Sequence, residues 1–252
     1  MFGKFFFILL ILIFYIPVAY AQTIPITISS SMENVIFDGK WTFTREWKES
    51  SLTEIGGTDS GSIYLRTAHL GNYIYVMIDA VGITHFEKNA DRAIVCFDGK
   101  NDKSMIADPD DYCVFSILGQ NSTFVLQGGS LLGANSNFKK IPTPDGFIGT
   151  GNISDENDRY SNTPHQSYEF RIPIDVMGRS SMYGFYVALY DTHENKIYSW
   201  PSMTFDSPLK IPAPNNWGEI VSPDKTLPEF ELPLFALFPA FLVVLYFTKF
   251  KI

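Results

Sequence analysis

Residues 62–80, SIYLRTAHLGNYIYVMIDA, decide the fold of this chain. Two runs rich in Tyr, Ile, Val and Leu stand on either side of Gly71-Asn72, a pair that is typical of a tight hairpin turn. Tyr73–Ile78 is apolar at alternate and at intervening positions, which is expected of a central strand that is covered on both faces. The segment therefore predicts two antiparallel strands in the middle of a sheet.

Further segments of the same kind lie on both sides of this hairpin. They are rich in aromatic and β-branched residues and are bounded by Gly, Asn, Asp or Pro. The strand candidates are Thr23–Ile28, Ser62–His69, Tyr73–Ala80, Arg92–Asp98, Tyr112–Leu118, Thr123–Gln127, Phe147–Asn152, Ser167–Pro173, Tyr183–Tyr190 and Lys196–Trp200. Helical periodicity is not sustained anywhere, and Ile174–Met182 would form at most a turn or two of helix. We therefore expect an all-β chain, with residues 22–221 folded as an antiparallel, jelly-roll-like β-sandwich.

The first residues are typical of an export signal. Lys4 precedes the apolar run Phe5–Val18, and Ala19-Tyr20-Ala21 is a small-x-small cleavage site. As a helix, this run spans about 21 Å, which is short of the hydrocarbon core of about 30 Å. We expect a signal peptide over residues 1–21 that is cleaved after Ala21, and a permanent anchor is the alternative.

The last residues indicate a membrane anchor. Leu232–Phe247 carries no charge and is followed by Lys249 and Lys251, so residues 232–252 are expected to form a transmembrane helix with a basic tip. A buried helix of the globular domain is the alternative. The lysines would stay in the cytoplasm and leave the domain outside, at the cell surface, with residues 222–231 as a stalk.

Composition restricts the partners. The chain has 19 Lys and Arg against 27 Asp and Glu, and without Lys4, Lys249 and Lys251 the exposed part keeps 16 basic residues and a net charge of −11. Such a surface repels nucleic acid and suits hydroxyl-rich partners or divalent cations. About 200 residues suffice for one sizeable core.

Two cysteines and two sequons fit an extracellular setting. Cys96 and Cys113 each lie in an apolar, strand-like segment, and a disulfide between them is expected if these strands are neighbours, while two buried thiols are the alternative. Asn121-Ser122-Thr123 and Asn152-Ile153-Ser154 are candidate glycosylation sites, at Asn121 and Asn152.

A series of short motifs runs along almost the whole domain. In order, they are Ile36-Phe37-Asp38-Gly39-Lys40-Trp41 with Glu46-Trp47, Tyr73-Ile74-Tyr75-Val76, Asp91–Asp98, Tyr168-Glu169-Phe170-Arg171-Ile172-Pro173, Ser199-Trp200-Pro201 and Trp217-Gly218-Glu219-Ile220. Together they resemble the family 9 carbohydrate-binding modules over Val35–Val221. The resemblance implies a sandwich that holds sugar between tryptophans and binds structural calcium. DOMON-like domains and haem-binding dehydrogenase subunits share this sandwich, so it also leaves haem open.

The C-terminal region carries a second resemblance. Pro228-Glu229-Phe230, followed by an apolar span and a basic tip, resembles the sorting signal of archaeal surface proteins. The resemblance implies an archaeal source and removal of the span by a membrane transpeptidase, with a plain anchor as the equal alternative.

Sugar binding requires exposed flat rings with polar groups at the rim. Trp200, Trp217 and Trp47 are the candidates, and Trp200 at the end of a strand is the best placed. Structural packing is the alternative for each ring. A folded protein that binds no glycan on a broad array would count against this function.

Calcium and haem are the candidate cofactors. Carboxylates in two turns, Asp98, Asp102, Asp110 and Asp111, offer the hard oxygen ligands that calcium requires, although acidic loops are commonly just solvated. Covalent haem is excluded because no Cys-x-x-Cys-His occurs, whereas Met77, His69 and His85 could ligate a non-covalent haem.

Catalytic motifs are missing from the sequence. Neither His-Glu-x-x-His nor Gly-x-Ser-x-Gly occurs, and sandwich modules of this size normally bind without cutting, although a glycosidase carboxylate pair stays open. We expect a non-catalytic surface protein that binds glycan. A haem-binding electron-transfer domain and a structural envelope component are the alternatives.

Overall fold

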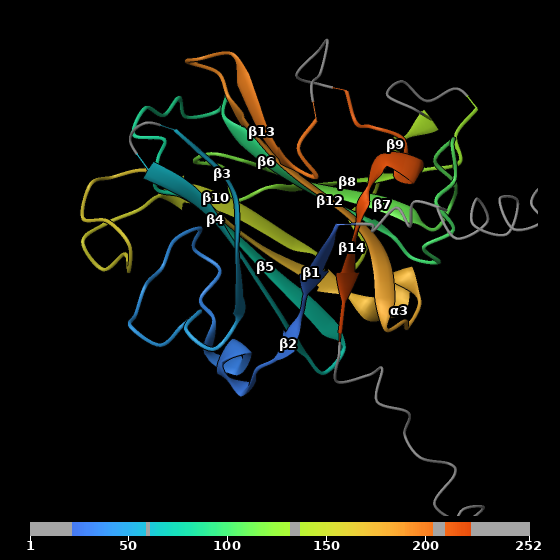
Figure 1. The fold of residues 1–252 in the computed structure, drawn as a ribbon, viewed down its shortest axis with the longest axis horizontal. Helices are drawn as coiled ribbons and strands as arrows, with labels where there is room; N and C mark the ends of the chain where they lie inside the picture. The colour runs from blue at the N-terminus through green and yellow to red at the C-terminus, as the bar shows by residue number, and fades with distance from the viewer. Residues whose placement is uncertain (1–21, 59–60, 132–136, 204–209, 223–252) are drawn as a thin grey trace, which may run out of the picture.

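The structure, a computed structural model, describes residues 22–58, 61–131, 137–203 and 210–222. Within these ranges the strands form two sheets that pack face to face as a sandwich (Figure 1). Sheet A has the order β1-β14-β12-β6-β7-β8-β9, and β13 also pairs with β12. Sheet B has the order β10-β11-β5-β4-β2, and β3 also pairs with β4. The expected β-sandwich is confirmed, but it is not wholly antiparallel, because β1 pairs with β14 and β2 pairs with β4 in parallel.

The bounds of most elements follow the predicted segments closely, but the expected strand Thr23–Ile28 is divided into β1 in sheet A and β2 in sheet B. Sheet A consists of β1 (Thr23–Pro25), β6 (Arg92–Asp98), β7 (Asp111–Ile117), β8 (Thr123–Gln127), β9 (Lys139–Ile141), β12 (Met182–Asp191), β13 (Lys196–Trp200) and β14 (Gly218–Val221). Sheet B consists of β2 (Thr27–Ile28), β3 (Ser51–Thr58), β4 (Gly61–Leu70), β5 (Tyr73–Ala80), β10 (Ile148–Ile153) and β11 (Gln166–Pro173). The described helices are η1 (Ser30–Asn34), α3 (Ile174–Met177) and η2 (Pro214–Asn216).

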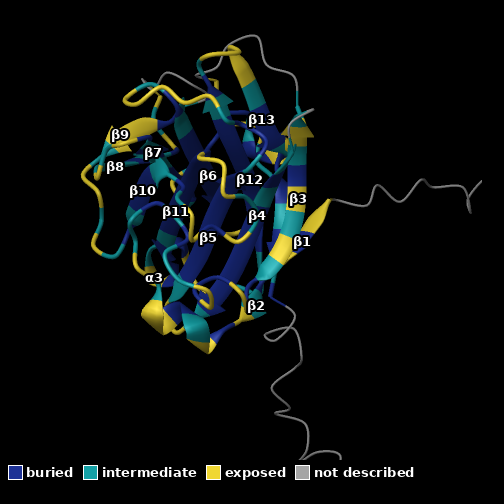
Figure 2. Cartoon of the chain, turned by 90° about the vertical axis from the view of Figure 1, so that its left-hand side faces the viewer, coloured by how far each residue is buried: buried dark blue, intermediate teal, exposed yellow. Residues whose placement is uncertain are grey.

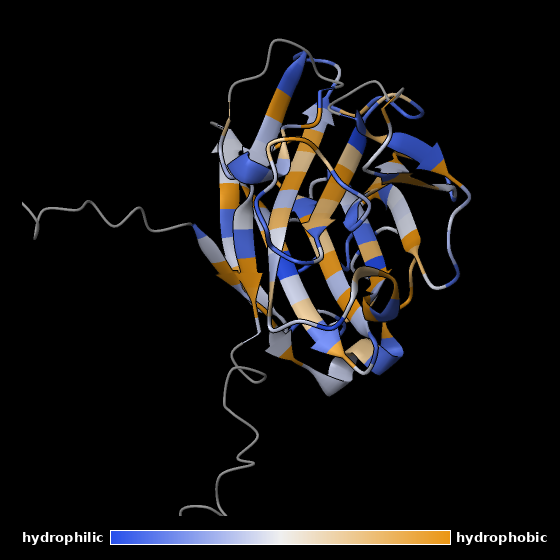
Figure 3. Cartoon of the chain, turned by 90° about the vertical axis from the view of Figure 1, so that its right-hand side faces the viewer, coloured by the Kyte–Doolittle hydropathy of each residue, from blue (hydrophilic) through white to orange (hydrophobic). Residues whose placement is uncertain are grey.

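The main core lies between the two sheets. Hydrophobic and hydrophilic residues alternate along many of the strands (Figure 3), so one face of each strand turns inward. Val76 and Ile78 of β5 meet Val95 and Phe97 of β6 in this core. The central strands are buried along most of their length, whereas β9 and the loops are exposed (Figure 2).

Both outer faces are covered as well. On sheet B, Met77 and Tyr75 of β5 pack against Trp41 and Trp47 from the long segment between β2 and β3. On sheet A, Trp217 and Phe138 cover the strands. This double coverage explains why β5 is apolar at successive positions, as expected from the sequence.

The disulfide is confirmed. Cys96 of β6 and Cys113 of β7 are direct partners in the antiparallel register, and their sulfur atoms are bonded. The hairpin turn at Gly71 is also confirmed, since Leu70 pairs with Tyr73 across it.

Three strands had no counterpart among the expected ones. β3 contains Ser, Thr and Gly rather than an apolar run, and its pairing with β4 makes it a strand. β9 is a short strand at the edge of sheet A, and β14 is a short strand between β1 and β12. The expected helical turn after Pro173 is present as α3.

The two hydrophobic ends, residues 1–21 and 232–252, lie outside the described residues, together with the cleavage site at Ala21 and the Pro-Glu-Phe motif. In the part of the chain that the structure does describe, no helix has the length and apolar content needed to cross a membrane.

Candidate functional site

A buried carboxylate joins two motifs that lie far apart in the sequence. Glu169 of β11 accepts the amide N–H groups of Asp38 and Gly39 at 3.0 and 2.8 Å through Oε2, and the indole N–H of Trp47 at 2.8 Å through Oε1. Burial, followed by the nearby carboxylate of Glu46, raises the pKa of Glu169, while the indole and amide donors oppose the shift. The link holds the Asp38-Gly39 turn on the outer face of sheet B.

A groove opens on this outer face, next to that turn, with a volume of about 640 Å³. It runs from η1 past the β4–β5 turn to α3. Its aromatic lining is Phe37, Tyr73 and Tyr75, and its polar lining is Glu33, Asn72, Asp145, Arg171 and Asp175.

The rings of the groove form a connected platform. Phe37 stacks with Tyr75 at 6.1 Å between ring centroids, and Tyr73 meets Tyr75 edge-on at 6.4 Å. The guanidinium of Arg171 lies 5.5 Å from the ring of Phe37 and 4.6 Å from that of Tyr73, and it donates a hydrogen bond to the carbonyl of Gly146. Phe37 and Tyr73 are only half-buried. Flat apolar rings with charged groups beside them are the chemistry that a sugar ring needs.

The expected tryptophans are placed differently. Trp47 and Trp217 are 0% and 3% exposed, so neither ring presents a face on which a sugar could stack. Trp47 is held by Glu169, and the Trp217 indole donates to the carbonyl of Pro212 at 3.0 Å. Trp200 is half-exposed at the end of β13, but its ring packs near Phe185 and over Gly218. A Cβ added to Gly218 would lie only 2.4 Å from Cη2 of the Trp200 ring.

The expected metal-binding carboxylates divide into two groups. Asp102 and Asp110 lie close together with Asp108, which was not among the ligands expected from the sequence. Asp98 and Asp111 are instead buried opposite each other at the ends of β6 and β7. Burial raises the pKa of Asp111 to about 8, and the neighbouring carboxylates of Asp98, Asp108 and Asp110 add to the shift.

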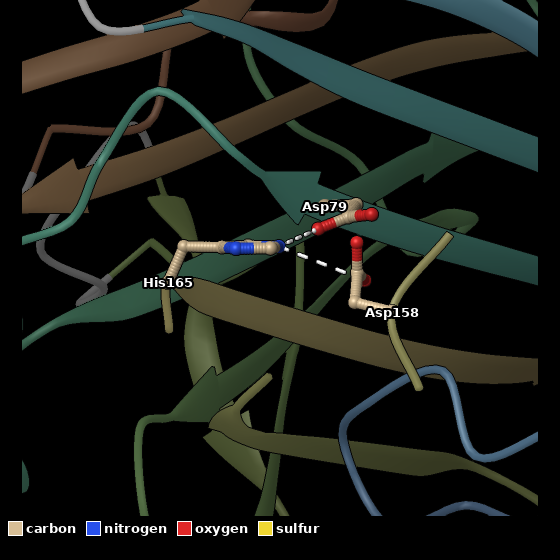
Figure 4. Close-up of side chains that lie close together, drawn as sticks. All are labelled: Asp79, Asp158 and His165. Carbon is tan, nitrogen blue, oxygen red and sulfur yellow. Dashed lines mark hydrogen bonds and ion pairs between the residues drawn. The ribbon is translucent and has the colours of Figure 1, made fainter. Parts of the chain in front are cut away.

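A second group of potential ligands was not predicted. Asp79 at the end of β5, Asp158 in the loop after β10 and His165 just before β11 point toward one another in the interior (Figure 4). Nε2 of His165 lies 2.6 Å from Oδ1 of Asp79 and 3.7 Å from Oδ2 of Asp158, and all three side chains are fully buried. Because Asp79 is far in sequence from Asp158 and His165, and the three follow no known ligand spacing, the sequence offered no signal for this group.

The charges in this buried triad influence each other strongly. Burial lowers the pKa of His165, but the carboxylates of Asp158 and Asp79 outweigh it and raise the pKa to about 10. Burial raises the pKa of Asp79 to about 6 against the opposing effect of His165.

The candidate haem ligands do not form a pair. His69 of β4 lies opposite Ile74 in the register, on the inner face of sheet B, whereas Met77 belongs to the cluster on the outer face. The sheet separates them, so they cannot ligate one iron from its two sides. His85 is exposed and stacks on His193 at 4.4 Å between ring centroids.

The two sequons differ in accessibility. Asn121 is exposed in the loop before β8. Asn152 is half-buried, and its Nδ2, the atom that would carry the glycan, donates to the carbonyl of Asp38 at 3.1 Å. The geometry therefore favours Asn121 over Asn152 as a glycosylation site.

Comparisons with known proteins agree with this architecture. The chain is similar to a family 9 carbohydrate-binding module from Caldicellulosiruptor kristjanssonii in complex with cellotriose, with a TM-score of 0.50, 13% identity, and coverage of 80% of this chain and 93% of that chain. The same module in complex with glucose gives a TM-score of 0.49 at 13% identity, with coverage of 80% and 95%. The first likeness shows the fold alone, which is like that of a family 9 module. No protein-family profile and no curated protein matches the chain.

Proposed function

We propose that this chain is a non-catalytic carbohydrate-binding protein and that the groove on the outer face of sheet B holds the sugar. The observation that carries the proposal is the platform of Phe37, Tyr73 and Tyr75, with the guanidinium of Arg171 over one face of the Phe37 and Tyr73 rings. The fold likeness to a module solved with cellotriose supports it.

The lining of the groove sets the class of sugar. The apolar C–H face of a pyranose packs on the half-exposed rings of Phe37 and Tyr73, while ring hydroxyls donate to carboxylates at the rim. Glu33, Asp145 and Asp175 outnumber Arg171 in the lining, so the groove favours a neutral glycan over an anionic one.

Binding can be measured with the purified full-length chain on a glycan array, followed by calorimetric titration with cello-oligosaccharides. We expect Phe37→Ala and Tyr73→Ala each to weaken binding about tenfold or more, because a lost contact of about 1.4 kcal/mol changes the dissociation constant tenfold. Trp200→Ala tests the other candidate contact, and it is expected to leave binding unchanged.

Two results would reject this site. If the well-folded wild type binds no glycan, the function fails. If Trp200→Ala abolishes binding while Phe37→Ala and Tyr73→Ala retain it, the sugar lies at the end of β13 rather than in the groove.

We further propose that the sandwich faces the outside of the cell, anchored to the membrane by its C-terminus. The disulfide between Cys96 and Cys113 supports an oxidising compartment. Calcium is proposed to bind the β6–β7 loop through Asp102, Asp108 and Asp110, whose oxygens lie within 4.8 Å of one another.

A further inference from the structure

The strongest unassigned feature is the buried triad of Asp79, Asp158 and His165. One nitrogen and two carboxylate oxygens converge inside the molecule from β5, the loop after β10 and the start of β11, with every side chain fully buried (Figure 4). We propose that these three residues bind one divalent transition-metal ion, and that zinc fits the donor set best. The site is independent of the sugar groove.

Neighbouring groups aim each ligand atom at the common centre. Oδ1 of Asp158 accepts the amides of Tyr160 and Ser161 at 2.8 and 3.0 Å, which leaves Oδ2 facing His165. Nδ1 of His165 lies 2.7 Å from the carbonyl oxygen of Thr163. Because a carbonyl can only accept, Nδ1 carries hydrogen and Nε2 is the atom directed at the carboxylates. A histidine that ligates a metal is commonly held in this way.

Two oxygens in the triad lack hydrogen-bond partners. Oδ2 of Asp79 and Oδ2 of Asp158 are both buried and accept no hydrogen bond. A buried carboxylate oxygen without a hydrogen-bond donor destabilises the fold, and a bound cation would remove this cost for both oxygens. Within the described residues, the ion pairs of both carboxylates are formed with His165 alone.

The charge balance favours a metal ion over a single proton. If Nε2 carries a proton, the imidazolium and two carboxylates leave a net charge of −1 in the interior. With neutral His165 and a divalent ion, the triad is neutral, and the cost of burying an uncompensated charge disappears. A single proton on Nε2 reaches Oδ1 of Asp79 at 2.6 Å and leaves Oδ2 of Asp158, 3.7 Å away, without a hydrogen bond, whereas an ion bonds to all three ligand atoms.

The donor set selects the metal. Calcium takes six to eight oxygen ligands and magnesium near-octahedral oxygen ligands, whereas an imidazole with two carboxylates suits zinc. Zinc bonds of about 2.0–2.2 Å at tetrahedral angles place two ligand atoms about 3.3 Å apart. The separation of 2.6 Å between His165 and Asp79 would widen, and that of 3.7 Å between His165 and Asp158 would narrow.

The ion would fasten the loop after β10 to sheet B. This loop carries Tyr160, whose ring stacks on Tyr64 at 4.2 Å and whose hydroxyl receives hydrogen bonds from Arg66. The loop also carries Asp155, which pairs with Lys40 beside the Asp38-Gly39 turn. The three side chains leave one tetrahedral position for a water molecule, and we expect a structural ion because every ligand is buried and the loop is attached to sheet B.

The test uses the purified full-length chain, dialysed against zinc-free buffer and examined by elemental analysis and X-ray absorption. We expect one zinc ion per chain, with one imidazole nitrogen and otherwise oxygen ligands. A chelator should lower the melting temperature, and zinc, but neither calcium nor magnesium, should restore it.

Variants separate this site from binding at the surface. Asp158→Asn should abolish stoichiometric zinc, and the milder Ser154→Ala should weaken zinc binding about 10–100-fold, because Ser154 contacts Nδ1 at 2.9 Å and accepts the amide of His165. His85→Ala, which removes one ring of the exposed His85–His193 pair, is the matched control and should retain the ion. Zinc that is lost in His85→Ala but kept in Asp158→Asn would overturn the proposal. So would a folded wild type that takes up no zinc and shows no thermal shift with it.

Discussion

Gly39→Ala tests the link between the Asp38-Gly39 turn and sheet B. Gly39 has φ = +83°, and a Cβ added there would lie 2.6 Å from the backbone N of Asn152. Gly178 is a matched control because its φ is +86° and its added Cβ would meet nothing within 4 Å. Both substitutions introduce backbone strain of about 1–3 kcal/mol. Both variants have a positive φ, and they differ because only the Cβ added at Gly39 would contact Asn152 of β10.

The contact at Gly39 is with backbone, which has no flexible end to move aside. Ordinary contact begins at 3.4 Å, so the turn has to move away from Asn152 by roughly 0.8 Å. Such a shift breaks the 2.8 Å hydrogen bond from Gly39 to Glu169 and leaves a buried amide without an acceptor, which costs about 1–3 kcal/mol. We expect Gly39→Ala to lose about 2–6 kcal/mol of unfolding free energy and Gly178→Ala about 1–3 kcal/mol.

Urea denaturation followed by tryptophan fluorescence measures both values, and an unchanged m-value shows that the same surface unfolds. If the two variants differ by less than about 1 kcal/mol, the clash and the carboxylate link contribute little, and the reasoning is refuted.

Three further predictions concern the disulfide, the buried acids and the acidic loop. Replacing Cys96 and Cys113 by Ser should cost about 3 kcal/mol of unfolding free energy, measured by urea denaturation, because the bridge closes a loop between residues 17 positions apart; no loss would mean that the reduced chain is equally restrained. Burial raises the pKa of Glu46, so the folded chain binds a proton that the unfolded chain releases above its ordinary pKa. Its contribution to the unfolding free energy is present at low pH and lost as the pH rises through the folded pKa, and Glu46→Gln should flatten this dependence; an identical pH profile in both proteins would contradict it. Calcium should raise the melting temperature of the wild type more than that of a variant with Asp108→Asn and Asp110→Asn, and equal thermal shifts would argue against calcium in that loop.

The strands were largely predictable because their pattern is local. Alternation and β-branched or aromatic residues are read over five to ten positions, and β5, β6 and β12 lie where the sequence placed them. β3 was not predictable in this way, since its Ser, Thr and Gly residues become a strand only by pairing with β4.

The candidate site was much less predictable. Whether a tryptophan is a platform or a core residue depends on which segment covers it, and the sequence does not state this for Trp47 or Trp217, both of which are buried. The groove joins Phe37, Tyr73 and Arg171 from three separate segments, and nothing in their spacing indicates that they meet.

The sequence by itself determined an all-β sandwich, because strand propensity and two-residue periodicity act between near neighbours in the chain. The bond between Cys96 and Cys113 required the pairing of β6 with β7, which sets the two residues opposite each other. Only the tertiary structure decided which side chains are exposed, which carboxylates converge with His165, and that Glu169 holds the Asp38-Gly39 turn. These features arise from contacts between residues about 10 to 130 positions apart, whose relative positions are fixed by sheet register and packing rather than by local sequence.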